Sequence, residues 1–158
     1  MIVACQEKQG PRARRVYPLL KEPQTLQKVA EKMSAVPNLL EGASWQVMAE
    51  PDFVAVLVDD VGIIALDRLR PGENARGHIT FWDGQLRGRE LLGRRVALMW
   101  MERYQLNCIY TAVPLIARKV ALFCERLGFK AEKIEDGWVH MVLYPPYLHG
   151  ANSTQGGP

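Results

Sequence analysis

The sequence predicts a single α/β domain in which helices flank a mixed central sheet. Two helical patterns come first, and three short apolar runs separated by turn signals follow, as in an antiparallel meander. A long helical pattern then divides the third run from a fourth, 108–113, which is rich in β-branched and aromatic residues. Strands joined through a helix are usually parallel neighbours with a right-handed crossover, so the fourth strand adds a parallel pair to the sheet.

The totals fit one soluble globular domain. The chain has 158 residues, 48% of them hydrophobic and 23% charged, and its formal net charge of +3 does not by itself imply a nucleic-acid partner. Cys5, Cys108 and Cys124 give neither a disulfide framework nor a zinc pattern, which favours a reducing, cytoplasmic setting. No apolar run has the length of a signal-peptide core or a membrane span, so no membrane partner is expected.

Proline positions and apolar spacing predict the elements of the N-terminal half. Pro23 suits the first turn of a helix that ends before Pro37, and a second short helix runs from about Asn38 to before Pro51. The three strands of the meander are expected at 53–58, 62–69 and 78–82, after a shorter strand within 15–20.

The C-terminal half adds two helices and a final hairpin. One helix is expected at about 87–104, and a second ends at Gly128 in a left-handed cap. The apolar positions that mark this second helix are Ile116, Val120, Phe123 and Leu127. Asp136-Gly137 signals a hairpin between strands at 130–134 and 138–144. The tail, 147–158, has little apolar content and is predicted to be disordered, which leaves 1–146 as the domain.

The stretch from Arg76 to Gly88 is the first candidate for function, because it leads from a strand through a glycine-bearing turn into the long helix. A helix N-terminus presents unpaired backbone N–H groups and the positive end of the helix dipole. With Gln85, Arg87 and Arg89 nearby in sequence, these groups form a plausible seat for phosphate. The alternative is an ordinary solvated loop that happens to carry basic residues.

Two segments resemble a known family, the GCN5-related N-acetyltransferases (GNAT). The segment Arg118–Phe129 is similar to the end of that fold, where the last helix is commonly followed by Leu-Gly-Phe, here Leu127, Gly128 and Phe129. The family binds acetyl-CoA pyrophosphate on a loop of pattern Gln/Arg-x-x-Gly-x-Gly/Ala, whose matching positions here are Gln85, Gly88 and Glu90. The resemblance covers approximately 22–144, and the order of elements supports it more strongly than either motif.

This resemblance implies an acyl-CoA-dependent N-acyltransferase with acetyl-CoA as co-substrate and a small-molecule or protein amine as acceptor. In the family, neighbouring parallel strands splay apart and the pantetheine arm lies in the gap, while the pyrophosphate meets backbone N–H groups at the start of the following helix. The positions that would carry the co-substrate are Phe81, Trp82, Asp83, Gln85, Leu86, Arg87, Gly88, Arg89 and Glu90.

Two residues are candidates for proton transfer. His78 lies on the third meander strand and is a candidate general base for the incoming amine, with a structural histidine as the alternative. Cys124 occupies the position where many family members carry the tyrosine that protonates the departing thiolate, and a buried packing cysteine is its alternative. Asp83 is an acceptor-binding carboxylate or, more simply, the start of an Asx turn. The histidines show no metal-ligand spacing, so no metal is expected.

Three departures from the family pattern support a second hypothesis. Glu90 replaces the last glycine or alanine of the phosphate loop, Cys124 the tyrosine, and Ala117 an asparagine near the start of the last helix. These changes fit a catalytically impaired GNAT-like binding or assembly module, of a compact type that occurs in phage and prophage gene clusters. Nucleic-acid binding is the least supported hypothesis. It would use two arginine clusters, Arg12, Arg14 and Arg15 in one and Arg87, Arg89, Arg94 and Arg95 in the other. The aromatic-rich last hairpin offers a surface for pairing in a homodimer.

Overall fold

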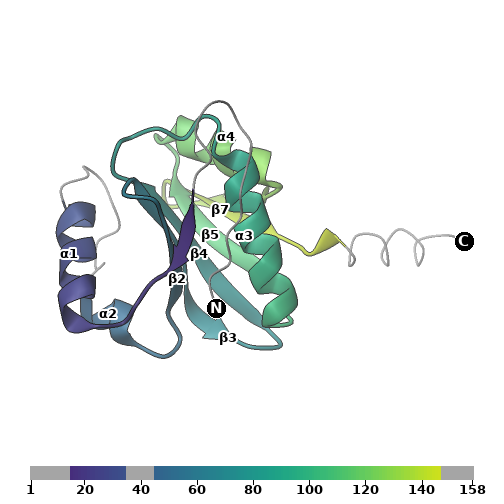
Figure 1. The fold of residues 1–158 in the computed structure, drawn as a ribbon. Helices are drawn as coiled ribbons and strands as arrows, with labels where there is room; N and C mark the ends of the chain where they lie inside the picture. The colour runs from purple at the N-terminus through teal and green to yellow at the C-terminus, as the bar shows by residue number, and fades with distance from the viewer. Residues whose placement is uncertain (1–14, 35–44, 147–158) are drawn as a thin grey trace, which may run out of the picture. The chain divides into compact units, whose positions relative to one another are not determined.

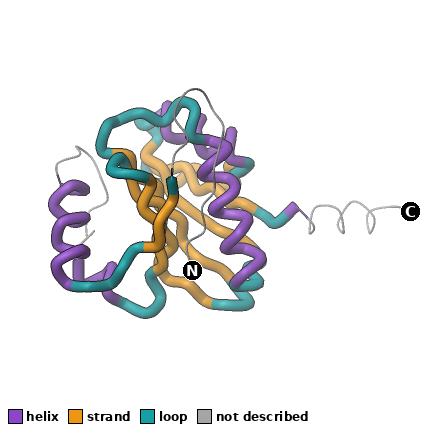
Figure 2. Tube along the Cα trace, viewed as in Figure 1, coloured by secondary structure: helices purple, strands orange, loops and turns teal. Residues whose placement is uncertain are grey.

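The computed structural model of the protein describes residues 15–34 and 45–146 (Figure 1). The first part of the predicted second helix, 38–44, and the predicted disordered tail, 147–158, lie outside the described residues. Figure 2 distinguishes helices from strands and shows the connecting loops between them.

Helices and strands follow one another in the predicted order. The helices are α1 (Pro23–Ser34), α2 (Trp45–Ala49), α3 (Glu90–Arg103) and α4 (Arg118–Leu127). The strands are β1 (Val16–Pro18), β2 (Val54–Val58), β3 (Gly62–Arg70), β4 (Asn74–Phe81), β5 (Cys108–Pro114), β6 (Lys130–Glu135) and β7 (Trp138–Leu143). Every element predicted for the described part of the chain is therefore present, with ends that differ by a few residues.

The strands form one mixed sheet of seven in the order β1-β2-β3-β4-β5-β7-β6. β4 and β5 are parallel, with Asn74 opposite Cys108 and Arg76 opposite Tyr110, which confirms the predicted crossover through α3. β2 and β3 are antiparallel, as are β5 with β7 and β7 with β6. The last hairpin thus enters the sheet with its second strand next to β5.

The residues divide into two compact units, Met1–Leu69 with Gly77–Gly88, and Arg70–Arg76 with Arg89–Pro158. The core of the first unit lies between α1, α2 and one face of β2 and β3, and Figure 1 shows α1 and α2 next to each other. Its buried residues are Leu19, Leu26, Val29, Met33, Met48, Phe53, Ile63 and Ala65. The single domain expected over 1–146 stays a prediction.

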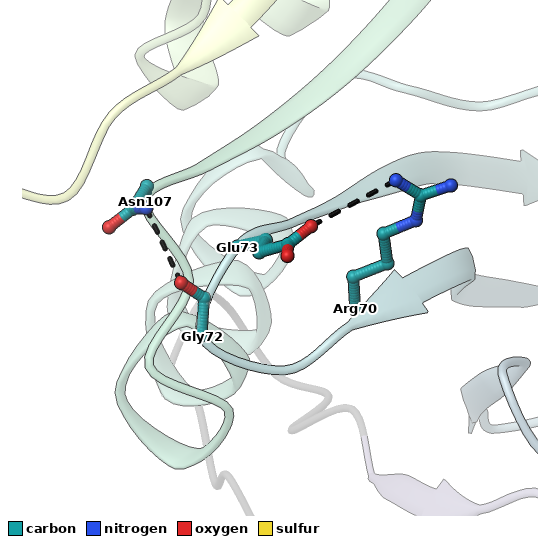
Figure 3. Close-up of polar contacts among 4 residues, drawn as sticks. All are labelled: Arg70, Gly72, Glu73 and Asn107. Atoms are coloured by element: carbon teal, nitrogen blue, oxygen red, sulfur yellow. Dashed lines mark hydrogen bonds and ion pairs between the residues drawn. The ribbon is translucent and has the colours of Figure 1, made fainter.

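The second unit buries one side of α3 and one side of α4, together with Ile109 and Val113 of β5 and 141–143 of β7. The buried positions of the two helices are Leu92, Gly93, Val96, Ala97, Trp100, Met101, Phe123, Cys124 and Leu127. Two hydrogen bonds from Asn107 join the start of β5 to the turn before β4. The Asn107 backbone N–H donates to the Glu73 carbonyl at 2.7 Å. Its side-chain amide donates to the Gly72 carbonyl at 3.4 Å (Figure 3).

Two expectations need correction. β4 begins at Asn74, four residues before the predicted start at His78, because pairing with β5 holds the polar segment 74–76 in the sheet despite its weak strand propensity. The predicted apolar side of the last helix is only half right. Phe123 and Leu127 are buried, but Ile116 precedes the helix and is 92% exposed, and Val120 is 39% exposed. The second and third turns of α4 therefore pack on the core, whereas the first turn does not.

Candidate active site

The loop after β4, residues 82–89, has the tight geometry predicted from its glycines. Gly84 and Gly88 have φ angles of +73° and +83°, a region that favours glycine, and no atom lies within 4 Å of a Cβ built on either residue. Asp83 forms the predicted Asx turn, because its Oδ1 accepts the Gln85 N–H at 3.1 Å. The Gly84 N–H donates to the Phe81 carbonyl at 3.0 Å. Both glycines therefore set the path of the loop into α3.

The middle of this loop offers donors to an anion. Within the described part of the chain, the backbone N–H groups of Leu86 and Arg87 make no hydrogen bond, while Gln85 and Arg87 are exposed. Arg89 differs from these two, because it is only 2% exposed and is therefore not a surface cation like Arg87. Unpaired backbone N–H groups before a helix suit a phosphate group.

The end of β4 is fixed by packing and by backbone bonds. Phe81 is 4% exposed, and its ring lies against Gly62, where a Cβ would come within 2.3 Å of the Phe81 Cδ1 atom. The Trp82 N–H donates to the Val61 carbonyl at 2.9 Å, and the Trp82 indole N–H donates to the Asp60 carbonyl. Packing and hydrogen bonds within its own unit thus fix the end of β4, the segment for which the resemblance implies pantetheine binding.

Lys32 of α1 also lies over the indole of Trp82, with its Nζ 5.4 Å from the ring centroid. Such a cation–π contact contributes on the order of 0.5–1 kcal/mol at an exposed position. The ring is packed against the core cluster of the first unit as well. Trp82 therefore connects the end of β4 to α1 through its side chain.

Glu90, the first residue of α3, is paired with a cation. Arg126 of α4 places its Nη1 3.3 Å from Glu90 Oε1, and the Glu90 side chain is 20% exposed. A carboxylate in the first turn also interacts favourably with the helix dipole. A carboxylate at this position would repel a pyrophosphate, and Arg126, which the sequence analysis did not select, partly offsets its charge.

His78 on β4 and Asp67 on β3 form a largely buried pair. The His78 Nε2 and Asp67 Oδ1 atoms are 2.8 Å apart, and the side chains are 13% and 9% exposed. Asp67 was missed in the sequence. The sequence does contain an indication of this residue. Asp67 directly follows the apolar run Ile63–Leu66, at a position where the strand pattern predicts a buried side chain.

Cys124 lies on the buried face of α4. It is 9% exposed, and burial, with a smaller effect from the Glu125 carboxylate, raises the pKa of its thiol from 9.0 to about 11. At neutral pH this thiol is protonated and unreactive, which agrees with a packing role. The start of α4 has no side-chain cap at Ala117, where the family often has an asparagine.

Among the described residues, no group of three or more His, Cys, Asp and Glu side chains could hold a metal ion. No helix in the same residues is long and apolar enough to cross a membrane.

The fold is that of solved N-acetyltransferase structures. A dodecameric spermidine N-acetyltransferase from Vibrio cholerae in an intermediate state matches with a TM-score of 0.66 and 16% identity, covering 87% of this chain and 98% of that one. The Campylobacter jejuni N-acetyltransferase PseH in complex with acetyl coenzyme A matches with a TM-score of 0.61 and 11% identity, covering 83% and 98%. No protein-family model matches the chain, and no curated protein matches it in sequence.

These similarities confirm the predicted acetyltransferase-like fold over most of the chain. At such low identities they concern the fold alone, because one fold can host different functions.

Proposed function

We propose that this protein is an acyl-CoA-dependent N-acyltransferase that moves an acetyl group from acetyl-CoA to an amine. The observation that carries the proposal is the loop after β4, with left-handed Gly84 and Gly88, an Asx turn at Asp83 and N–H groups at Leu86 and Arg87 that make no hydrogen bond within the described residues. It stands in a fold shared with an N-acetyltransferase that was solved with acetyl coenzyme A.

The loop is proposed to bind the pyrophosphate of the co-substrate. The backbone N–H groups of Leu86 and Arg87 would donate to phosphate oxygens, and the exposed Gln85 and Arg87 side chains would add donors and positive charge. Arg126 supports this assignment, because its ion pair reduces the repulsion that Glu90 would exert on a phosphate. The backbone at 81–83 is proposed to bind the pantetheine amides.

Acetyl transfer requires a base for the amine. The amine lone pair forms the new C–N bond, the C–S bond breaks with its electron pair on sulfur, and the amine loses a proton. His78 is proposed to take this proton, because it is partly accessible and hydrogen-bonded to a carboxylate. The acceptor class, a small-molecule or protein amine, rests on the same proposal.

A second candidate function is a binding or assembly module with impaired catalysis. The raised pKa of the buried Cys124 thiol favours it. A thiol with a pKa of about 11 is a weaker acid than an ordinary cysteine, so it is a poor proton donor to a departing thiolate. Such a module keeps the fold and lacks turnover, and it is distinguished from the enzyme by the absence of acetyl transfer to any amine.

The deciding experiment combines calorimetry with acetyl-CoA and an acetyl-transfer assay on a panel of amines. The matched pair of variants is Gly88→Ala and Gly72→Ala, since both glycines have φ near +80° and open space around a new Cβ. Each substitution costs about 1–2 kcal/mol of backbone strain. We expect only Gly88→Ala to weaken acetyl-CoA binding, by about tenfold or more. Equal affinities of the two variants, or no binding by the wild type at millimolar ligand, would refute the proposal.

A further inference from the structure

Asp67 is a carboxylate in an environment that penalises charge. Its side chain is 9% exposed and it directly follows the buried residues Ile63–Leu66 of β3. An isolated carboxylate in such a place costs several kcal/mol, and a hydrogen-bonded partner offsets that cost. His78 is this partner at 2.8 Å. The pair therefore joins an acid and an imidazole in a setting of low dielectric constant.

The backbone next to Asp67 is unusual. Arg68 has a φ angle of +50° inside β3, although it is not a glycine. A left-handed residue of this kind costs on the order of 1–3 kcal/mol and persists where the surroundings impose it, often at functional positions. The next residue makes a backbone hydrogen bond, in which the Leu69 N–H donates to the Asp52 carbonyl at 3.1 Å. The strained residue thus immediately follows the one that holds His78.

The face that carries the pair also carries an unsatisfied hydroxyl. Side chains alternate along a strand, so His78 and Thr80 share one face of β4. Thr80 is 2% exposed, and its Oγ1 has no hydrogen-bond partner in the described part of the chain. Buried hydroxyls are usually hydrogen-bonded, so an unpaired one beside His78 marks a place where an N–H donor would be favourable.

We propose that Asp67 is a positioning residue for His78 in acetyl transfer, a role that rests on the proposed function. Asp67 Oδ1 accepts the hydrogen bond of the Nε2–H group, which fixes the neutral tautomer that has its lone pair on Nδ1. Nδ1 takes the proton that the amine loses as the C–N bond forms and the C–S bond breaks. Asp67 stabilises the resulting imidazolium, and the proton then passes to solvent or to the thiolate.

The competing explanation is a structural pair that only fills the interior. Both explanations predict a loss of stability when Asp67 is replaced, so stability does not separate them. The tautomer of His78 and the division of the kinetic effect between kcat and KM do separate them, because a positioning residue acts on the chemical step.

The first test is the ¹⁵N NMR spectrum of the imidazole in the full-length wild-type protein. We expect neutral His78 to be protonated on Nε2 and unprotonated on Nδ1. A neutral Nδ1–H tautomer overturns the proposal. This measurement needs neither a variant that folds nor any turnover.

The second test compares Asp67→Asn with Asp59→Asn. Asp59 is a matched control, because its Oδ1 also accepts a hydrogen bond, from Arg15 N–H at 3.0 Å, in the exposed turn between β2 and β3. An asparagine at 67 offers either an oxygen or an N–H group, so the tautomer of His78 becomes mixed. We expect Asp67→Asn to lower kcat at least ~100-fold with KM within about threefold, and Asp59→Asn to change neither.

The outcomes separate the two proposals. Acetyl transfer by the wild type with unchanged kcat in Asp67→Asn overturns the positioning role and leaves the proposed function standing. A wild-type protein that transfers no acetyl group to any amine overturns the proposed function, and the positioning role falls with it.

Discussion

Glu90 and Arg126 form an ion pair between the first residue of α3 and the last turn of α4, with 3.3 Å between Oε1 and Nη1. Glu90 stands where the family pattern has a glycine or alanine, and its carboxylate would repel a phosphate bound at this helix start. The ion pair with Arg126 reduces that repulsion. Under the proposed function, Arg126 would affect co-substrate binding without direct contact with the ligand.

Arg126→Gln is expected to weaken acetyl-CoA binding. Loss of the cation removes the positive charge that offsets Glu90. Unit charges ~6 Å apart in water repel by about 0.7 kcal/mol, or roughly threefold in Kd. Adding Glu90→Gln to this variant should restore the affinity, because the repelling charge is then removed. Isothermal titration calorimetry at low ionic strength measures both effects.

The control for that series is Lys133→Gln. It removes one positive charge from another exposed ion pair of the same unit, in which Lys133 Nζ is 2.9 Å from Glu135. Equal loss of affinity in Lys133→Gln and Arg126→Gln would show a general effect of net charge and would count against the role of Arg126.

Gly62→Ala is expected to destabilise the protein by about 3 kcal/mol. The added Cβ would lie 2.3 Å from Phe81 Cδ1 and 2.7 Å from the Thr80 backbone oxygen, so β3 and the end of β4 must shift. Gly84→Ala serves as the comparison, because its Cβ meets nothing within 4 Å and adds only the strain of its φ of +73°. Urea unfolding measures both. A cost for Gly62→Ala no larger than that of Gly84→Ala would show that the strands repack freely.

Much of the fold was predictable because local signals specify it. Pro23 begins α1, Gly128 ends α4 with a φ of +109°, and Asp136-Gly137 forms the last hairpin turn with both φ angles positive. The start of β4 was not predictable in this way. Residues 74–76 have weak strand propensity, and they pair with 108–110 of β5, which lie more than thirty positions further along the chain.

The candidate site was predictable only in its backbone. The glycine positions and the Asx turn at Asp83 follow from residue type, and the structure has them as expected. The two side-chain pairs do not follow from residue type. His78 meets Asp67 across 11 positions and Glu90 meets Arg126 across 36, and no local pattern fixes which partner a side chain finds at such separations.

Thr80→Val is expected to stabilise the protein by about 1 kcal/mol. The substitution keeps the shape of the side chain and removes a buried hydroxyl that has no partner among the described residues. Thr25→Val, at a partly exposed position of α1, makes the same chemical change and should alter stability by only a few tenths of a kcal/mol. Thermal and urea unfolding provide the comparison. A destabilised Thr80→Val variant would mean that the hydroxyl is satisfied in solution, for example by a water molecule.

Cys124→Ala tests the buried thiol through the pH dependence of stability. The folded protein keeps this proton up to a pKa of about 11, whereas an unfolded chain gives it up near 9.0. The contribution of the thiol to the free energy of unfolding is therefore fully present below about pH 9 and is lost as the pH rises toward 11. At 1.36 kcal/mol per pKa unit, the loss amounts to about 2.7 kcal/mol at most.

We expect the difference in unfolding free energy between wild type and Cys124→Ala to fall as the pH rises from about 9 to about 11, the interval between the pKa of the unfolded thiol and that of the folded one. Groups common to both proteins cancel in this difference, which urea unfolding at several pH values provides. A constant difference would mean that the thiol is not held protonated by burial.

The Cys124→Ala variant also tests whether Cys124 donates the proton to the departing thiolate. A weak acid of pKa about 11 contributes little to protonating a thiolate, so kcat should stay within about threefold of wild type. A fall of ~100-fold would instead assign that role to Cys124.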